Sequence, residues 1–154
     1  MSASNGHILI VEDDADLLEV LKFVLEDEGY EVTTTDRGAE AFAIAAAHEF
    51  ALVLLDVAMP DVDGIELAKQ LRADPRTSHL RLAIHTGLPA ADIRERFTDY
   101  DAFIGKAEEA DQLIAAIQAA MALPLRPRSP IPTASAAPEA EVRGAPIADA
   151  SAAP

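Results

Sequence analysis

Acidic residues follow two apolar stretches of the sequence, and side chains of this type can bind a divalent cation. Glu12 and Asp13 follow the apolar residues 8–11, and Asp56 follows the apolar run 51–55. Crowded carboxylates repel one another, and a bound cation removes that conflict. Because the candidate donors are all oxygen atoms, we expect Mg²⁺ rather than Zn²⁺. Asp13 and Asp56 are the expected direct ligands, and Glu12 is expected to act through a water molecule.

The same residues predict phosphoryl chemistry. An aspartate carboxylate can attack a phosphoryl group and form an acyl phosphate, and Asp56 is the candidate nucleophile. The charge on the transferred oxygens must then be neutralised by a metal ion and a second cation. Lys106 follows a short apolar stretch near residue 104, and the hydroxyl group of Thr86 ends another. These two side chains could contact the phosphoryl oxygens from the side opposite the metal.

The elements that must position these residues are short apolar runs alternating with helical patterns. Five strand and helix units predict a parallel sheet with helices on both faces. In such sheets ligands bind beyond the carboxyl ends of the strands, where Asp13, Asp56, Thr86 and Lys106 all fall. Strands are predicted over 8–11, 31–34, 51–55, 80–86 and 102–104, and helices over 16–28, 39–47, 65–72, 90–97 and 111–123.

Composition restricts the possible partners. The chain has 154 residues and a net charge of −15, which disfavours binding to nucleic acid. It has no cysteine, no signal-peptide pattern at its start and no apolar run long enough to span a membrane, so we expect a cytoplasmic protein that does not insert into membranes. Seven of the ten prolines follow residue 123. We therefore expect a folded domain over 1–123 and a disordered tail over 124–154.

Four motifs together resemble the receiver domains of two-component response regulators, over roughly residues 6–123. They are ILIVEDD at 8–14, LVLLDVAMPDVDG at 52–64, HTG at 85–87 and FIGK at 103–106. The resemblance implies a flavodoxin-like, doubly wound sheet of five parallel strands in the order 2-1-3-4-5. It also implies a signalling protein that catalyses only its own phosphorylation and dephosphorylation. With no output domain after residue 123, we expect a stand-alone receiver with an unknown downstream protein.

The resemblance also implies roles for individual residues. Asp56 is expected to accept a phosphoryl group from a sensor histidine kinase or a histidine phosphotransfer protein. Mg²⁺ is expected to lie between Glu12, Asp13, Asp56 and the backbone carbonyl of Ala58. Thr86, Lys106 and Phe103 are expected to respond to the phosphorylated state.

One departure from the family pattern leaves an alternative open. Receiver domains usually have a cis proline after the lysine, whereas Ala107 follows Lys106 here. A cis bond before alanine costs about 2.5 to 4 kcal/mol, so we predict a trans peptide. The altered loop is compatible with a receiver-like interaction module that takes no phosphate. An aspartate-based phosphatase is disfavoured, because Ala58 stands where a general acid would be needed.

The histidines are not expected to take part in the chemistry. They are scattered without the spacing of metal ligands, and we interpret all four as structural or surface residues. They are His7, His48, His79 and His85.

Overall fold

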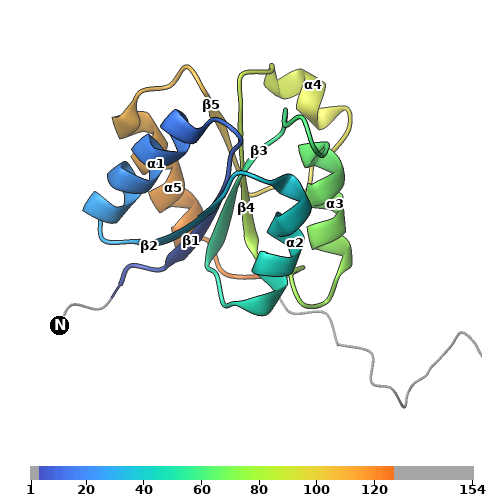
Figure 1. Ribbon diagram of the computed structural model, residues 1–154, viewed down its shortest axis with the longest axis horizontal. Helices are drawn as coiled ribbons and strands as arrows, with labels where there is room; N and C mark the ends of the chain where they lie inside the picture. The colour runs from blue at the N-terminus through green and yellow to red at the C-terminus, as the bar shows by residue number, and fades with distance from the viewer. Residues whose placement is uncertain (1–3, 127–154) are drawn as a thin grey trace, which may run out of the picture.

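The computed structural model describes residues 4–126, which form five strands alternating with five helices (Figure 1). The strands are β1 (His7–Val11), β2 (Glu31–Thr35), β3 (Leu52–Asp56), β4 (Arg81–Thr86) and β5 (Ala102–Gly105). The helices are α1 (Ala15–Asp27), α2 (Gly38–Ala47), α3 (Gly64–Ala73), α4 (Ala90–Arg94) and α5 (Ala110–Ala122). No helix in this described range is long and apolar enough to cross a membrane.

All the strand pairs are parallel, and the strand order β2-β1-β3-β4-β5 confirms the predicted topology. Strand β1 pairs directly with β3, with Val11 opposite Leu55. The residues that follow β1 therefore lie beside Asp56 at the end of β3. Strand β4 continues the sheet with His85 opposite Asp56, so the carboxyl ends of β1, β3 and β4 meet at one edge.

Helices cover both faces of the sheet. Figure 1 shows α1 and α5 on one side and α2, α3 and α4 on the other. Alternate strand residues supply the two cores: Leu9, Val53 and Ile84 face α2 to α4, whereas Ile8, Leu54 and Ile104 face α1 and α5. Burial on both faces explains why the sequences of the central strands β1 and β3 are continuous apolar runs rather than alternating ones.

Aspartate side chains start the two helices that follow the strands nearest the predicted site. Asp14 caps α1 by accepting the backbone N–H groups of Asp16 at 3.0 Å and Leu17 at 3.2 Å. Asp63 caps α3 by accepting the N–H group of Ile65 at 2.9 Å. Because these residues satisfy the free amides of the helices, Glu12 and Asp13 remain available for other interactions.

The segment between β4 and β5 differs most from the prediction. A helix was predicted over 90–97, but α4 ends at Arg94. The N–H groups of Arg96 and Phe97 both point to the carbonyl of Ile93, which tightens the last turn. Phe97 follows this turn and is buried in the core.

Two other predictions concern the Lys106–Ala107 peptide bond and the tail after α5. The structure contains no cis peptide bond among residues 4–126, so the Lys106–Ala107 bond is trans as predicted. Residues 124–126 follow α5 without forming a helix or strand, and Arg126 pairs with Asp99 and Asp101. The rest of the predicted tail, 127–154, lies outside the described residues.

Candidate active site

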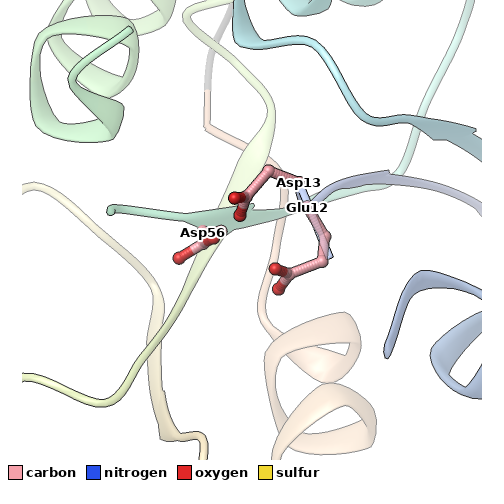
Figure 2. Close-up of side chains that lie close together, drawn as sticks. All are labelled: Glu12, Asp13 and Asp56. Carbon is pink, nitrogen blue, oxygen red and sulfur yellow. The ribbon is translucent and has the colours of Figure 1, made fainter. Parts of the chain in front are cut away.

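Three carboxylates converge at the carboxyl edge of the sheet (Figure 2). Glu12 and Asp13 directly follow β1, and Asp56 is the last residue of β3. One oxygen atom of each lies within 4.8 Å of the other two. Glu12 and Asp56 are each only 1% exposed, whereas Asp13 is exposed to solvent. The cluster therefore opens to solvent on the Asp13 side.

Lys106 is the cation within this cluster. Its Nζ atom lies 3.2 Å from both carboxylate oxygens of Glu12 and 3.3 Å from Oδ2 of Asp56. A hydrogen bond from the Lys106 backbone N–H to the Thr86 carbonyl, 2.9 Å long, holds the residue at the end of β4. The ammonium group thus joins the acids of β1 and β3 to the loop that follows β5.

Lys106 does not satisfy all the buried oxygens. Its hydrogen bond is directed to Oε2 of Glu12, and its contacts with Glu12 Oε1 and Asp56 Oδ2 are ion pairs without hydrogen-bond alignment. Both of the latter oxygens are buried without a hydrogen-bond partner. Buried acceptors that lack a donor are costly, and they mark the place where a bound cation can be held.

The electrostatics of the site reflect this imbalance. Burial raises the pKa of Asp56 to about 7, and the neighbouring carboxyl groups of Asp13 and Glu12 add to the rise. Lys106 and the Ala58 N–H group, which donates to Asp56 Oδ1 at 3.2 Å, act in the opposite direction. Burial alone would lower the pKa of Lys106, but the charges of Asp56 and Glu12 outweigh it and raise the pKa.

A glycine allows the loop after Asp56 to fold closely onto the strand end. A Cβ atom at Gly64 would lie 2.4 Å from the Asp56 carbonyl oxygen and 2.5 Å from Val57 Cα, which is too close for any side chain. The Gly64 N–H group donates to the Val57 carbonyl at 2.9 Å. This contact fixes the loop and the position of Ala58, whose backbone is a predicted metal ligand.

Thr86 and Phe103 lie near the cluster without bonding to it. Thr86 is buried at the end of β4, and its Oγ1 accepts the Leu88 N–H group at 3.1 Å. Within residues 4–126, Thr86 has no side-chain bond to Asp56 or Lys106. Phe103 of β5 pairs with Ile84 of β4, and its ring is tilted against that of Tyr100, with the ring centroids 6.2 Å apart. A Cβ atom at Gly87 would have no neighbour within 4 Å, so the space beside Thr86 is open.

The sequence analysis missed His85. This residue was interpreted as structural or surface, but its ring lies beside the cluster, with Nδ1 at 4.0 Å from Glu12 Oε1. A histidine one residue before Thr86, at the end of a predicted strand, was the available signal. Its distance from Glu12 depends on the pairing of β1, β3 and β4, which the sequence does not display.

The donor atoms of this cluster fit a hard divalent cation. Carboxylate oxygens are the ligands that Mg²⁺ uses in proteins, usually one or two together with water molecules and phosphate oxygens. Two buried oxygens without hydrogen-bond partners, Glu12 Oε1 and Asp56 Oδ2, lie at the centre of the site. Glu12, Asp13 and Asp56 are therefore the residues that could hold Mg²⁺.

Comparison with known proteins assigns the family. The model of the response regulator receiver domain family matches residues 8–118. YkoG of Bacillus subtilis (strain 168), described as an uncharacterized transcriptional regulatory protein, is 37% identical over 121 residues, which cover 75% of this chain and 51% of YkoG. The chain thus spans about half the length of this relative.

Solved structures give the same result. A CheY-like receiver domain protein from Methanospirillum hungatei JF-1 is 29% identical, with a TM-score of 0.70 over 78% of this chain and 94% of that one. TrrA from Thermotoga maritima, solved in complex with Mg²⁺-BeF, is 28% identical, with a TM-score of 0.66 over 74% of this chain and 97% of TrrA. Receiver domains are signalling proteins that interact with histidine kinases. With its sheet order, its acidic edge and these matches, this chain belongs to the family of response regulator receiver domains.

Proposed function

We propose that Asp56 accepts a phosphoryl group from the phosphohistidine of a sensor histidine kinase or a histidine phosphotransfer protein. The observation that carries this proposal is the convergence of Glu12, Asp13 and Lys106 on Asp56, a buried carboxylate at the end of a strand. A carboxylate in this position is fixed by the Ala58 N–H group and still has one oxygen, Oδ2, without a hydrogen bond. That oxygen is the candidate nucleophile.

The chemical step is a transfer of the phosphoryl group between two nucleophiles. An Asp56 carboxylate oxygen attacks the phosphorus atom, and the bond between phosphorus and the imidazole nitrogen of the donor breaks. The bonding electrons return to that nitrogen. The donor leaves as neutral imidazole when its other ring nitrogen carries a proton, and otherwise takes up a proton from water as the bond breaks. Lys106, 3.3 Å from Asp56 Oδ2, neutralises charge on the transferred oxygens, as cations do in other phosphoryl transfers.

Glu12, Asp13, Asp56 and the backbone carbonyl of Ala58 would hold Mg²⁺ in this proposal. When bound, the ion supplies positive charge that offsets the repulsion between the carboxylates and the incoming phosphoryl group. The raised pKa of Asp56, about 7, means that part of the population holds a proton on the nucleophile near neutral pH. Positive charge near the cluster favours the ionised, reactive form.

Thr86 and Phe103 are proposed to transmit the modification. A phosphoryl group on Asp56 adds up to two negative charges and three acceptor oxygens, which can draw the Thr86 hydroxyl away from the Leu88 N–H group. Movement of Thr86 frees space on the side of the sheet where Phe103 packs against Tyr100. The surface around α4 and β5 then changes, and a downstream protein reads that change.

Treatment with acetyl phosphate and Mg²⁺, followed by intact mass measurement, tests the proposal. We expect an adduct of about 80 Da on the wild-type chain, and its loss in Asp56→Asn. Chelation of divalent ions should also prevent the adduct. An unmodified wild-type chain would favour the alternative, an interaction module that works without phosphorylation. The trans Lys106–Ala107 bond and the short α4 are the features compatible with that alternative.

We also infer a cytoplasmic location and a role restricted to the protein's own phosphorylation and dephosphorylation. The absence of cysteine and the net charge of −15 support a cytoplasmic protein that does not bind nucleic acid. Fractionation of cells that express the tagged chain tests the location.

A further inference from the structure

His85 is a buried polar residue that the proposed mechanism does not use. Its side chain is only 7% exposed, and it lies on β4 opposite Asp56 of β3. Together with Lys106, the imidazole lines a pocket between α1 and α5, whose apolar wall includes Leu21 and Leu113. The ring therefore lies beside both the carboxylate cluster and this apolar pocket.

The ring can donate a hydrogen bond in either of its charge states. Burial, together with the positive charge of Lys106, lowers the pKa of His85 to about 4, and the opposing effect of Glu108 is smaller. An imidazole carries at least one N–H donor whether or not it is protonated, so the ring can act on a neighbouring carboxylate through a hydrogen bond.

The neighbour of the ring is an oxygen without a hydrogen-bond partner. His85 Nδ1 lies 4.0 Å from Glu12 Oε1, which is buried and accepts no hydrogen bond. This separation exceeds a direct hydrogen bond, which spans about 2.7 to 3.2 Å, but one bridging water can span it. Oε2, the other carboxylate oxygen of Glu12, already accepts from Lys106 Nζ at 3.2 Å and from the Asp14 N–H group at 3.3 Å.

We propose that His85 is a positioning residue for Glu12. Its Nδ1–H group donates through one water molecule to Glu12 Oε1, and this hydrogen bond keeps the carboxylate oriented toward the cation. The inference rests on the part of the proposed function that gives Glu12 a role in binding Mg²⁺. Residues that hold a metal ligand through a hydrogen bond typically change metal affinity when they are replaced. His85 does not touch the phosphoryl group in this account.

Three substitutions separate hydrogen bonding from packing. The amide nitrogen of asparagine occupies nearly the place of Nδ1, whereas that of glutamine reaches the place of Nε2. His85→Asn should therefore keep Mg²⁺ affinity close to wild type, while His85→Gln and His85→Leu should weaken it by about 10-fold, the lower limit of effects for such partners. Mg²⁺ titrations followed by backbone NMR shifts measure the affinities, and thermal unfolding shows that each variant is folded.

The ring itself gives a second readout. Nitrogen NMR of the wild type should show the Nδ1–H tautomer of His85, with a resonance that moves when Mg²⁺ is added. The Nε2–H tautomer would overturn the inference, as would unchanged Mg²⁺ affinity in His85→Leu. Failure of the proposed function is distinguishable, because it appears as a wild-type chain that binds Mg²⁺ but forms no phosphoryl adduct.

Discussion

The two edges of the sheet both carry buried charges, but the charges are balanced at only one of them. At the carboxyl edge, the carboxylates of Glu12, Asp13 and Asp56 surround a single ammonium group, that of Lys106. At the amino edge, two guanidinium groups meet two carboxylates, in a network formed by Arg72, Arg126, Asp99 and Asp101. The first edge thus has an excess of negative charge, and the second has none.

The hydrogen bonds differ in the same way. The Arg72 side chain, 8% exposed, donates to the Asp99 carbonyl at 2.9 Å, to the Ser78 carbonyl at 3.1 Å and to Asp101 Oδ2 at 2.9 Å. Asp101 Oδ2 also accepts the N–H group of Leu82 at 2.9 Å. In the described part of the chain, this network leaves one buried atom, Arg126 Nε, without a hydrogen-bond partner, whereas the opposite edge leaves two carboxylate oxygens, one of Glu12 and one of Asp56.

This difference distinguishes a structural network from a binding site. Balanced and bonded charges join α3, the start of β4, the segment before β5 and the segment after α5, so their loss should reduce stability. Unbalanced carboxylates cost stability and are retained for what they bind. Substitutions at the two edges should therefore change stability in opposite directions.

Arg72→Met should produce the largest effect. Removing this guanidinium takes one charged donor from Asp101, which keeps the Leu82 N–H group, and one donor from each of three backbone carbonyls. We therefore expect a loss of about 3 to 5 kcal/mol in the free energy of unfolding. Urea denaturation measures it. Lys69→Met is the matched control, because its exposed pair with Glu66 is worth about 0 to 1 kcal/mol. Equal losses in the two variants would contradict a structural role for the amino-edge network.

Asp56→Asn should act in the opposite direction. Without divalent ions and above pH 7, we expect a gain of about 1 to 3 kcal/mol in the free energy of unfolding, because a repelled buried charge is removed. Asp61→Asn is the control, and it should lower the free energy of unfolding. Asp61 accepts the N–H groups of Gly38 and Ala39, so its carboxylate should stabilise the fold. A destabilised Asp56→Asn variant would show that the carboxyl edge is balanced after all.

The stabilising effect of Asp56→Asn should depend on pH. The pKa of Asp56 rises from 3.8 to about 7 on folding, so between these values the folded chain keeps a proton that the unfolded chain releases. The stability of the wild type relative to Asp56→Asn should therefore be greatest below about pH 4 and fall as the pH rises to about 7. Urea denaturation at a series of pH values, in the presence of a chelator, measures the difference. A difference that stays constant across this range would rule out the raised pKa.

Arg126→Gln should give the smallest effect. The guanidinium is half-buried and pairs with Asp99 and Asp101, so we expect a loss of about 0.5 to 1 kcal/mol in the free energy of unfolding. Removal of residues 127–154 should leave this contribution intact, and removal of 124–154 should eliminate it. If both truncations had the same stability, residue 126 would not belong to the folded domain.

The sequence predicts the central strands well because both of their faces are buried, which makes their sequences apolar throughout. Apolar runs such as 51–55 identify buried strands, and the acids that follow them predict the site. Pairing of β1 with β3 then brings Glu12 and Asp56 together, as the resemblance to receiver domains implies. The strand ends therefore indicate which carboxylates converge, and the resemblance supplies the strand order.

Contacts that depend on details of packing could not be predicted. The approach of His85 to Glu12 depends on strand register, and the pairing of Arg126 with Asp101 joins residues 25 positions apart without any motif. The end of α4 at Arg94 coincides with a tightened turn in which Arg96 and Phe97 share the Ile93 carbonyl, which a helical pattern over 90–97 does not reveal. The first two of these features are decided by tertiary contacts rather than by local preference.

The dependence of stability on Mg²⁺ tests the central claim most directly, namely that the unbalanced carboxylates of the carboxyl edge form a cation site around Asp56. A ligand that binds only the folded state raises the free energy of unfolding as its concentration rises. We predict such a rise for the wild type and for Arg126→Gln, and a much smaller one for Asp56→Asn and Asp13→Asn. Equal responses in all four proteins, or no response in the wild type, would contradict the account.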